Sequence, residues 1–321
     1  MRRRLAGAIS VVALFLFVIS ILYSISTYRT YGAAGTVDVS VGIPPLAYLV
    51  ERIGGERVSV STLVVSGQDP HTFEPTPRQV MSLTSADVYF SVGLPFEERL
   101  LHKIAGSGSR LVVVDTAQGI ECEPRDASSE GDISADEHGS PDADHVDDEA
   151  DDIHDAHGAH DDPHIWLSPA HLMAQARTIA DSLATLDPVH AAEYERNLLN
   201  LLDDIAEVDK SIRAELQQWR GREFLIYHSA LSHFAETYGL VEISIETDGK
   251  SPGARALENI IERARAGRIR TVFVQPQFDS SVAQLIAEAL GADVVSLDPL
   301  EKDILSNLRS IAASLADSLR D

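Results

Sequence analysis

From residue 37 onward, short apolar runs rich in β-branched residues alternate with amphipathic stretches. The first pattern is typical of strands in a parallel sheet and the second of helices that cover it. Strands are predicted at residues 37–41, 58–65, 87–92 and 111–114, with helices near residues 45–53, 78–83 and 96–104. This alternation indicates a first α/β lobe built from βα units.

Two long helical stretches follow, at residues 170–186 and 189–219, interrupted at Asp187-Pro188. The second has about 30 residues and would span about 45 Å at 1.5 Å per residue. A helix of that length is better suited to joining two lobes than to packing on one small sheet. A second α/β set is then predicted, with strands at residues 223–227, 241–246, 271–275 and 293–297 and helices near residues 230–238, 254–265, 282–290 and 304–319.

The predicted fold class is therefore α/β, with two Rossmann-like parallel-sheet lobes joined by a long rigid helix. A chain of 321 residues suits two domains of ordinary size. Residues 121–162 break every periodicity and are predicted to be a disordered acidic insertion. The expected segments are 1–35 (membrane anchor or signal segment), 36–168 (N-terminal lobe with the insertion), 169–220 (linking helices) and 221–321 (C-terminal lobe).

The first 35 residues predict a membrane attachment. Three consecutive arginines precede an uncharged apolar run at residues 5–25. About 20 apolar residues can cross a bilayer and exceed a typical signal-peptide core, and leading arginines favour a cytoplasmic N-terminus. We therefore expect a protein anchored on the outer face of the cytoplasmic membrane. The alternative is cleavage near Ala33-Ala34, which would leave a protein of a secreted or periplasm-like space.

The net charge of −24 is concentrated in the insertion. Residues 121–162 hold 17 acidic residues against Arg125, which gives −16 and leaves −8 for the rest. So acidic a chain offers no basic stripe for phosphates, which argues against nucleic acid as a partner. Cations are the more natural ligands. The only cysteine, Cys122, allows no disulfide within the chain.

Four metal-capable side chains are predicted at the carboxyl ends of strands, where ligands bind in open parallel sheets. His71 follows the second strand of the first lobe, and His164 lies at the exit from the insertion. His228 and Asp298 each end a strand of the second lobe. Three imidazoles and one carboxylate suit a tetrahedral Zn²⁺ site in the cleft between the lobes, with Mn²⁺ as the alternative ion.

Each histidine ligand usually needs an acceptor for its second ring nitrogen. Asp69, Glu74 and Asp162 are near enough in sequence to fill that role or to supply an alternative fourth ligand. The histidines on predicted helix faces are interpreted as packing positions: His102, His171, His190 and His233.

The insertion carries five more histidines in its aspartate-rich background: His138, His145, His154, His157 and His160. Histidine-rich tracts bind metal weakly, and the surrounding negative charge raises the local concentration of cations. We therefore expect a low-affinity metal loop. The alternative is a solvated linker whose histidines are incidental.

Several segments, in order and with sensible spacing, carry a family resemblance over nearly the whole chain after the apolar run. They are Asp69-Pro-His-Thr-Phe-Glu-Pro-Thr-Pro, Ser85-Ala-Asp-Val-Tyr-Phe-Ser-Val-Gly, Asp162-Pro-His-Ile-Trp-Leu-Ser-Pro, Phe224-Leu-Ile-Tyr-His-Ser-Ala, Val274-Gln-Pro-Gln-Phe and Ser296-Leu-Asp-Pro-Leu. Together they resemble the metal-specific solute-binding proteins of ABC importers for zinc and manganese. A histidine at position 228 is similar to the zinc-preferring branch.

The resemblance implies a metal ion buried between two lobes that move little on binding. It also implies a monomer without enzymatic activity that captures zinc outside the cytoplasm and delivers it to an ABC permease and its ATPase. It leaves the fourth coordination position open between Asp298, water and an acidic residue elsewhere such as Glu74.

Three other functions stay open: a manganese-specific protein of the same type, a zinc-dependent hydrolase and a metal-sequestering surface protein. A hydrolase would need a general base beside the bound water. The sequence has no HExxH helix, and the four candidate ligands are spread over more than 220 positions. This spread favours capture over catalysis. A P-loop ATPase and a multi-span permease encoded beside this protein would favour import.

Overall fold

The computed structural model describes residues 35–105, 108–120, 162–246 and 250–320. Within them the strands form two four-stranded parallel sheets. The N-terminal sheet has the order β2-β1-β3-β4 and contains β1 (Val37–Val41), β2 (Val58–Thr62), β3 (Val88–Ser91) and β4 (Val112–Asp115). The C-terminal sheet repeats this topology as β6-β5-β7-β8, with β5 (Glu223–Ile226), β6 (Val241–Ser244), β7 (Thr271–Val274) and β8 (Asp293–Ser296). The predicted two-lobe α/β fold is confirmed.

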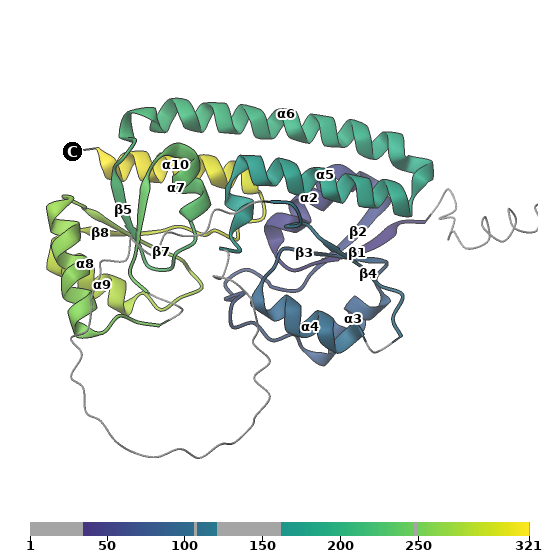
Figure 1. Cartoon of the computed structure of the whole chain (residues 1–321), viewed down its shortest axis with the longest axis horizontal. Coiled ribbons are helices and arrows are strands. Elements are labelled where there is room, and N and C mark those ends of the chain that lie inside the picture. The colour runs from purple at the N-terminus through teal and green to yellow at the C-terminus, as the bar shows by residue number, and fades with distance from the viewer. Residues whose placement is uncertain (1–34, 106–107, 121–161, 247–249, 321) are drawn as a thin grey trace, which may run out of the picture.

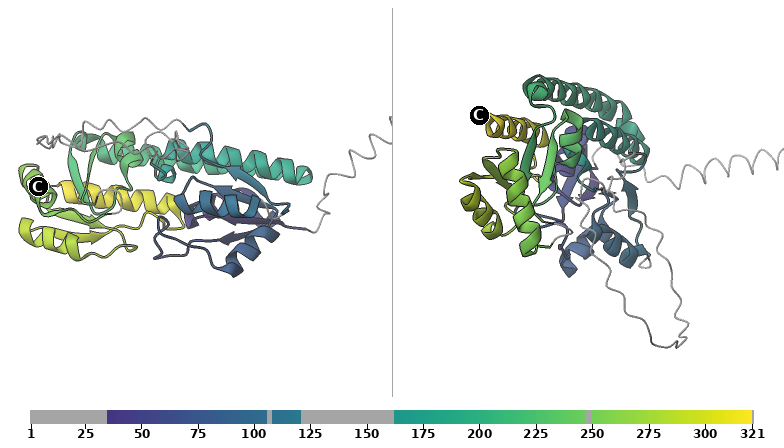
Figure 2. Two further views of the ribbon diagram at one scale, coloured as in Figure 1. Left: turned by 60° about the horizontal axis from the view of Figure 1, so that its bottom comes forward. Right: turned by 60° about the vertical axis from the view of Figure 1, so that its left-hand side comes forward.

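The helices of the N-terminal lobe are α2 (Pro44–Gly54), α3 (Pro77–Ser85) and α4 (Pro95–Ala105), and those of the C-terminal lobe are α7 (Ser232–Tyr238), α8 (Ala254–Ala266) and α9 (Ser281–Leu290). Three longer helices complete the described part of the fold: α5 (Pro169–Leu186), α6 (Ala191–Leu216) and α10 (Ile304–Leu319). Helix α6 lies along both lobes (Figure 1), and the left view of Figure 2 shows the same arrangement from another side.

Helix α6 can serve both lobes because one of its faces is apolar along its whole length. Its buried residues recur at intervals of three or four: Tyr194, Leu198, Leu201, Ile205, Val208, Ile212 and Leu216. This spacing places them on a single stripe. The stripe contacts α5, α2 and α10, so the helix packs against elements from both ends of the chain.

One continuous core connects the lobes. It includes the N-terminal sheet, the buried faces of α5, α6 and α10, and one face of the C-terminal sheet through Phe224, Ile226 and Phe273. The alternate residues of these strands, such as Leu225 and Val272, face a separate core with α8 and α9. Rotating one lobe far from the other would expose part of this core to water, and each Å² of exposed apolar surface costs about 25 cal/mol of free energy. This cost supports the expected small lobe movements.

The predicted order of helices and strands is confirmed, and the differences lie at element ends. Residues 188–219 form α6 flanked by the short 3₁₀ turns Pro188–His190 and Gln217–Trp219. The helix expected from residue 230 begins at Ser232 because Glu242 of β6 accepts hydrogen bonds from Ser229 Oγ and Leu231 N, which holds the preceding residues in a loop.

Two predicted features lie outside the described residues. The first is the apolar run at residues 5–25, and the second is the insertion through residue 161, with Cys122 and its five histidines. Asp162, which the prediction counted within the insertion, is described and has a side chain only 6% exposed. Across residues 35–105, 108–120, 162–246 and 250–320, no helix has the length and apolarity that a membrane crossing requires.

Candidate metal centre

The fold brings the carboxyl ends of both sheets to a common region between the lobes. In each sheet the chain moves first to one side of the initial strand and then to the other, and such switch points bind ligands outside the carboxyl ends of the strands. His71 lies in the loop between β2 and α3, and His228 follows β5 after one residue. His164 directly precedes the 3₁₀ turn Ile165–Leu167 that leads into α5.

Among the described residues, His71, His164 and His228 form a group whose ligand atoms could hold one metal ion. The Nε2 atom of His71 lies 3.3 Å from that of His164 and 3.2 Å from that of His228. The remaining pair, His164 and His228, has Nε2 atoms 3.4 Å apart. The three nitrogens therefore form a nearly equilateral triangle.

This triangle fits one face of a zinc tetrahedron. Two nitrogens bound to zinc at about 2.0–2.1 Å with tetrahedral angles lie about 3.3 Å apart. The described site offers three imidazoles, which suit zinc better than they suit manganese. The geometry and the donor set therefore fit Zn²⁺ with one coordination position left for another ligand.

The loops of His71 and His164 use the same local turn. Each histidine follows an Asp-Pro pair, and the aspartate Oδ1 accepts the backbone N–H of the histidine, at 2.9 Å for Asp69 and 3.0 Å for Asp162. Aspartate side chains favour such turns because they bond the backbone two residues on. The proline restricts the turn further, so the sequence Asp-Pro-His itself positions the imidazole.

The backbone of His228 is held by Gln275 at the end of β7. His228 N donates to Gln275 Oε1 at 3.1 Å, and Gln275 Nε2 donates to His228 O at 2.6 Å. Gln275 is 1% exposed, so this two-point contact is shielded from water. The ring of Phe278 lies 4.7 Å from the His228 ring and limits its rotation.

Two carboxylates bind the ring nitrogens that face away from the triangle. His164 Nδ1 lies 2.5 Å from Asp162 Oδ1, and His228 Nδ1 lies 2.5 Å from Glu246 Oε1. Each ionised carboxylate only accepts, so it keeps the proton on Nδ1 and leaves the Nε2 lone pair free. Ser232 Oγ donates to the other oxygen of Asp162 at 2.6 Å and fixes that carboxylate.

The protonation states favour metal binding. Burial, followed by the neighbouring imidazoles of His164 and His228, lowers the pKa of His71 to about 4. Burial also lowers the pKa of His164, although Asp162 opposes it. Burial acts to raise the pKa of Asp162, but the contacts with His164 and Ser232 outweigh it and hold that pKa well below its usual range. At neutral pH the two imidazoles are therefore neutral beside an ionised carboxylate.

The lowered pKa values of His71 and His164 predict zinc binding that is partly protected from mild acid. Three ligand histidines with the ordinary pKa near 6.5 would together lose about 50-fold in metal affinity between pH 7.5 and 6.0, because protons compete for the ligand nitrogens. We expect a loss of less than about tenfold here, because protons compete less for His71 and His164, measured by competition with a zinc chelator at each pH. A larger loss over this range would contradict the lowered pKa values.

The same shift affects the stability of the metal-free protein. Because the pKa of His71 is lower in the folded state, at about 4, than the ordinary 6.5, the unfolded chain binds more protons between those values. The contribution of His71 to the free energy of unfolding is therefore complete above about pH 6.5 and falls as the pH drops towards 4.

The other predicted site residues lie outside the histidine group. Asp298 Oδ1 accepts hydrogen bonds from Gln277 Nε2 at 2.7 Å and Leu300 N at 2.9 Å, which engages that oxygen in its own loop. Glu74 is exposed, and the side chain of Asp69 binds His71 N and Thr72 Oγ1. The five histidines of the predicted metal loop are outside the described residues, so their role stays a prediction.

The remaining histidines of the described chain have packing or surface contacts. His233 Nε2 lies 2.9 Å from the backbone oxygen of Asp162, and the His171 ring lies 5.0 Å from the His233 ring. His190 Nδ1 lies 2.6 Å from Asp187 Oδ2, and His102 is exposed. None of these four belongs to the group of three, although His233 supports the backbone of the site.

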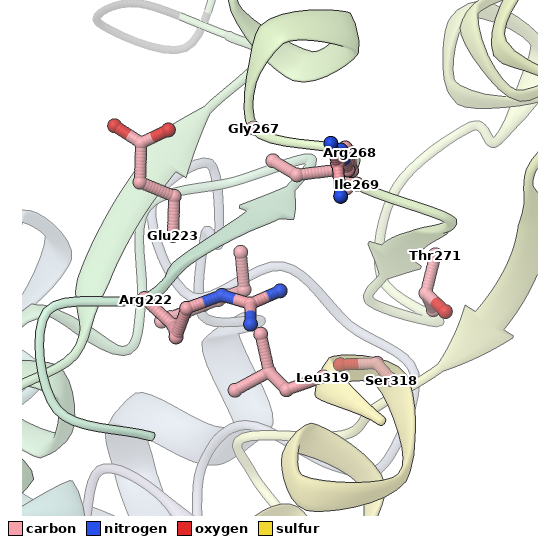
Figure 3. A pocket seen from close by; sticks show the side chains of 9 residues that line it. Arg222, Glu223, Gly267, Arg268, Ile269, Thr271, Ser318 and Leu319 are labelled. Carbon is pink, nitrogen blue, oxygen red and sulfur yellow. The ribbon is translucent and has the colours of Figure 1, made fainter. Parts of the chain in front are cut away.

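Two small cavities can be compared. One has a volume of about 10 Å³ and is lined by Pro70, the three histidines, Trp166, Gln277, Phe278, Pro299 and Leu300. The other, also about 10 Å³, lies at the opposite ends of the C-terminal strands (Figure 3) and is lined by Arg222, Glu223, Phe224, Gly267, Arg268, Ile269, Thr271, Ser318 and Leu319. It contains no histidine and one carboxylate, so it is no candidate for a transition metal.

Sequence reasoning missed Glu246, Gln275 and Gln277. Glu246 and Gln275 are the last residues of two predicted strands, so the strand-end argument that selected His228 also applied to them. The sequence argument covered only side chains that bind metal directly and partners within a few residues of each histidine. Glu246 is 18 residues from His228 in sequence, and only the parallel pairing of β5 with β6 brings it close.

Comparison with known proteins places this chain in a family. Residues 39–318 match the family described as zinc-uptake complex component A, periplasmic (ZnuA). A curated relative, a putative metal-binding protein of Treponema pallidum (strain Nichols), is 28% identical over 285 residues, covering 87% of this chain and 84% of the relative.

Two solved structures of ZnuA are similar to the whole described fold. A crystal structure of ZnuA has 35% sequence identity and a TM-score of 0.75, covering 88% of this chain and 99% of that one. A zinc-bound deletion mutant of ZnuA has 34% identity and a TM-score of 0.75, covering 89% and 99%. Since the family match extends over most of the sequence, this chain belongs to the ZnuA family of metal-binding solute-binding proteins of ABC transporters.

Proposed function

We propose that this protein captures one zinc ion outside the cytoplasm through His71, His164 and His228 and delivers it to an ABC importer. The observation that carries the proposal is the triangle of Nε2 atoms at 3.2, 3.3 and 3.4 Å. It matches the nitrogen spacing of tetrahedral zinc, about 3.3 Å. The zinc-bound ZnuA structure and the family description support the choice of metal.

The surroundings of the triangle favour capture over hydrolysis. A zinc hydrolase needs a general base next to the metal-bound water. The two carboxylates beside the histidines, Asp162 and Glu246, both bind Nδ1 atoms on the far side of the rings. Glu74 is exposed. Within the described residues no carboxylate joins the group of three histidines.

The proposed delivery follows from the family role, in which a solute-binding protein serves a permease and its ATPase. The metal ligands come from both lobes, so a modest separation of the lobes would weaken the site without unfolding either sheet. A permease and a P-loop ATPase encoded beside this protein would support this step. Cells lacking this protein should then take up zinc through the importer only when zinc is added to the medium.

Metal identity is tested by titrating the metal-free full-length chain with Zn²⁺ and Mn²⁺ in a calorimeter, together with elemental analysis of protein purified without added metal. We expect one tight zinc site per chain and an affinity for Zn²⁺ at least about 100-fold above that for Mn²⁺, because three imidazoles suit zinc. Equal or tighter manganese binding would refute the zinc assignment.

A further inference from the structure

Gln277 stands out in the wall of the histidine cavity because one of its polar atoms is buried without a partner. Its Oε1 has no hydrogen-bond donor in the described structure, although Gln277 lines the cavity together with the three histidines. A buried carbonyl oxygen left unpaired is uncommon in folded proteins, because water and protein donors are both lost to it. This oxygen therefore requires an explanation.

The orientation of the Gln277 amide is fixed by chemistry. Gln277 Nε2 donates to Asp298 Oδ1 at 2.7 Å, and an ionised carboxylate can only accept. Leu300 N also donates to Asp298 Oδ1, at 2.9 Å, which holds the carboxylate in place. Exchanging the amide oxygen and nitrogen would place two acceptors against each other, so Oε1 is the atom that faces away from Asp298.

The neighbours of Gln277 place it beside a metal ligand. Two residues earlier, Gln275 holds the backbone of His228 from both sides. One residue later, the Phe278 ring lies 4.7 Å from the His228 ring at an interplanar angle of 31°. Phe278 N also donates to Gln275 O at 3.2 Å, which closes the turn around Gln277. The amide therefore has little freedom to move away from the cavity.

The histidine triangle leaves one tetrahedral position for a further ligand. A water in that position has two hydrogens, and zinc makes a bound water a stronger donor than bulk water. The cavity volume of about 10 Å³ is near the minimum that holds one water molecule. The unpaired Oε1 of Gln277 can accept a hydrogen bond from that water.

We propose that Gln277 Oε1 accepts a hydrogen bond from a water at the fourth coordination position, and that Asp298 orients Gln277 instead of binding the metal. This inference rests on the proposed zinc site. It makes Gln277 and Asp298 positioning residues. It also keeps the donor set neutral, without the carboxylate oxygen that favours Mn²⁺.

The test uses two variants of the full-length chain. Gln277→Met keeps the length of the side chain but removes the acceptor, and it should weaken zinc binding by about 10–100-fold, the usual effect of an outer partner. Asp298→Asn keeps an oxygen acceptor for Gln277 Nε2 and Leu300 N but no longer fixes the Gln277 amide by charge, so it should weaken zinc binding by less than Gln277→Met does, about tenfold at most. Its ratio of zinc to manganese affinity should also be unchanged.

Saturation with Co²⁺ supplies a readout of the metal's own ligands. The visible absorption of bound Co²⁺ depends on those ligands and their arrangement, so the water left without its acceptor in Gln277→Met should change the spectrum, whereas Asp298→Asn removes no ligand and should preserve it. Thermal unfolding of the metal-free variants checks that both fold. The inference is overturned if Gln277→Met matches wild type in affinity and spectrum, or if Asp298→Asn weakens zinc binding more than Gln277→Met does, as loss of a direct ligand would.

The outcomes separate this inference from the proposed function. If wild-type protein does not bind zinc, or if its affinity does not depend on the three histidines, the zinc site itself is wrong. If zinc binding requires the three histidines but Gln277→Met leaves the zinc affinity and the Co²⁺ spectrum unchanged, the zinc site is supported and the role of Gln277 is refuted.

Discussion

Replacing His71, His164 or His228 singly by alanine is expected to weaken zinc binding by more than about 100-fold, beyond the 10–100-fold typical of outer partners. Each ring supplies one corner of the nitrogen triangle, and the two remaining imidazoles cannot complete a tetrahedron. The affinity is measured on the full-length chain by calorimetry with a competing chelator, which isolates the tight site from any weaker ones.

His102→Ala is the matched control, because His102 is exposed on α4 and outside the group of three. It should leave the affinity for zinc unchanged. Thermal unfolding without metal establishes that each variant folds, which matters most for His164, since it is only 4% exposed. Wild-type affinity in any two of the three single variants would defeat the assignment of the site.

Glu246→Gln is expected to reduce zinc affinity by about 10–100-fold although Glu246 does not belong to the group of three. The carboxylate accepts from His228 Nδ1 at 2.5 Å and so fixes the tautomer that presents Nε2 to the metal. It also supplies negative charge behind the ligand. The amide of glutamine keeps the shape of the side chain but removes that charge, and its NH₂ group can compete for Nδ1.

The matched control for Glu246→Gln is Glu236→Gln, the same change at an exposed position on α7 of the same lobe. Asp162→Asn should resemble Glu246→Gln, because Asp162 has the equivalent contact with His164 Nδ1. Affinity within threefold of wild type in both site variants would mean that these carboxylates only stabilise the fold.

The position of the site would couple the proposed metal capture to folding. His71 comes from the N-terminal lobe, His228 from the C-terminal lobe and His164 from the start of α5 between them. A metal that binds only the folded state raises the free energy of unfolding by mass action. Because the lobes already share one core, an ion bound at this site would have little rearrangement to drive.

Much of the fold could be predicted because the relevant signals are local. Strand β1 has the predicted bounds, and α8, α9 and α10 lie within a residue or two of theirs. The late start of α7 could not be predicted, since Glu242 of a different element holds Leu231 outside the helix. Errors of this kind occur where a side chain from elsewhere in the chain binds the backbone.

The histidines of the site could be predicted from sequence because the ends of parallel strands share one edge of a sheet. The hydrogen bonds that Asp298 Oδ1 accepts from Gln277 and Leu300 could not be predicted, because the packing of loops brings these residues together. Sequence spacing likewise suggested Glu74 as a partner, whereas the structure exposes it and brings in Glu246 from β6.

The sequence by itself determined the elements, their order, the two-lobe α/β fold and the candidate imidazoles, because apolar periodicity and Asp-Pro-His turns act over a few residues. The tertiary structure decided which side chains meet. Distances of 3.2 to 3.4 Å between the nitrogens of residues 71, 164 and 228 depend on the relative placement of two sheets. That placement is set by the core shared through α5, α6 and α10, a sum of many contacts distant in sequence.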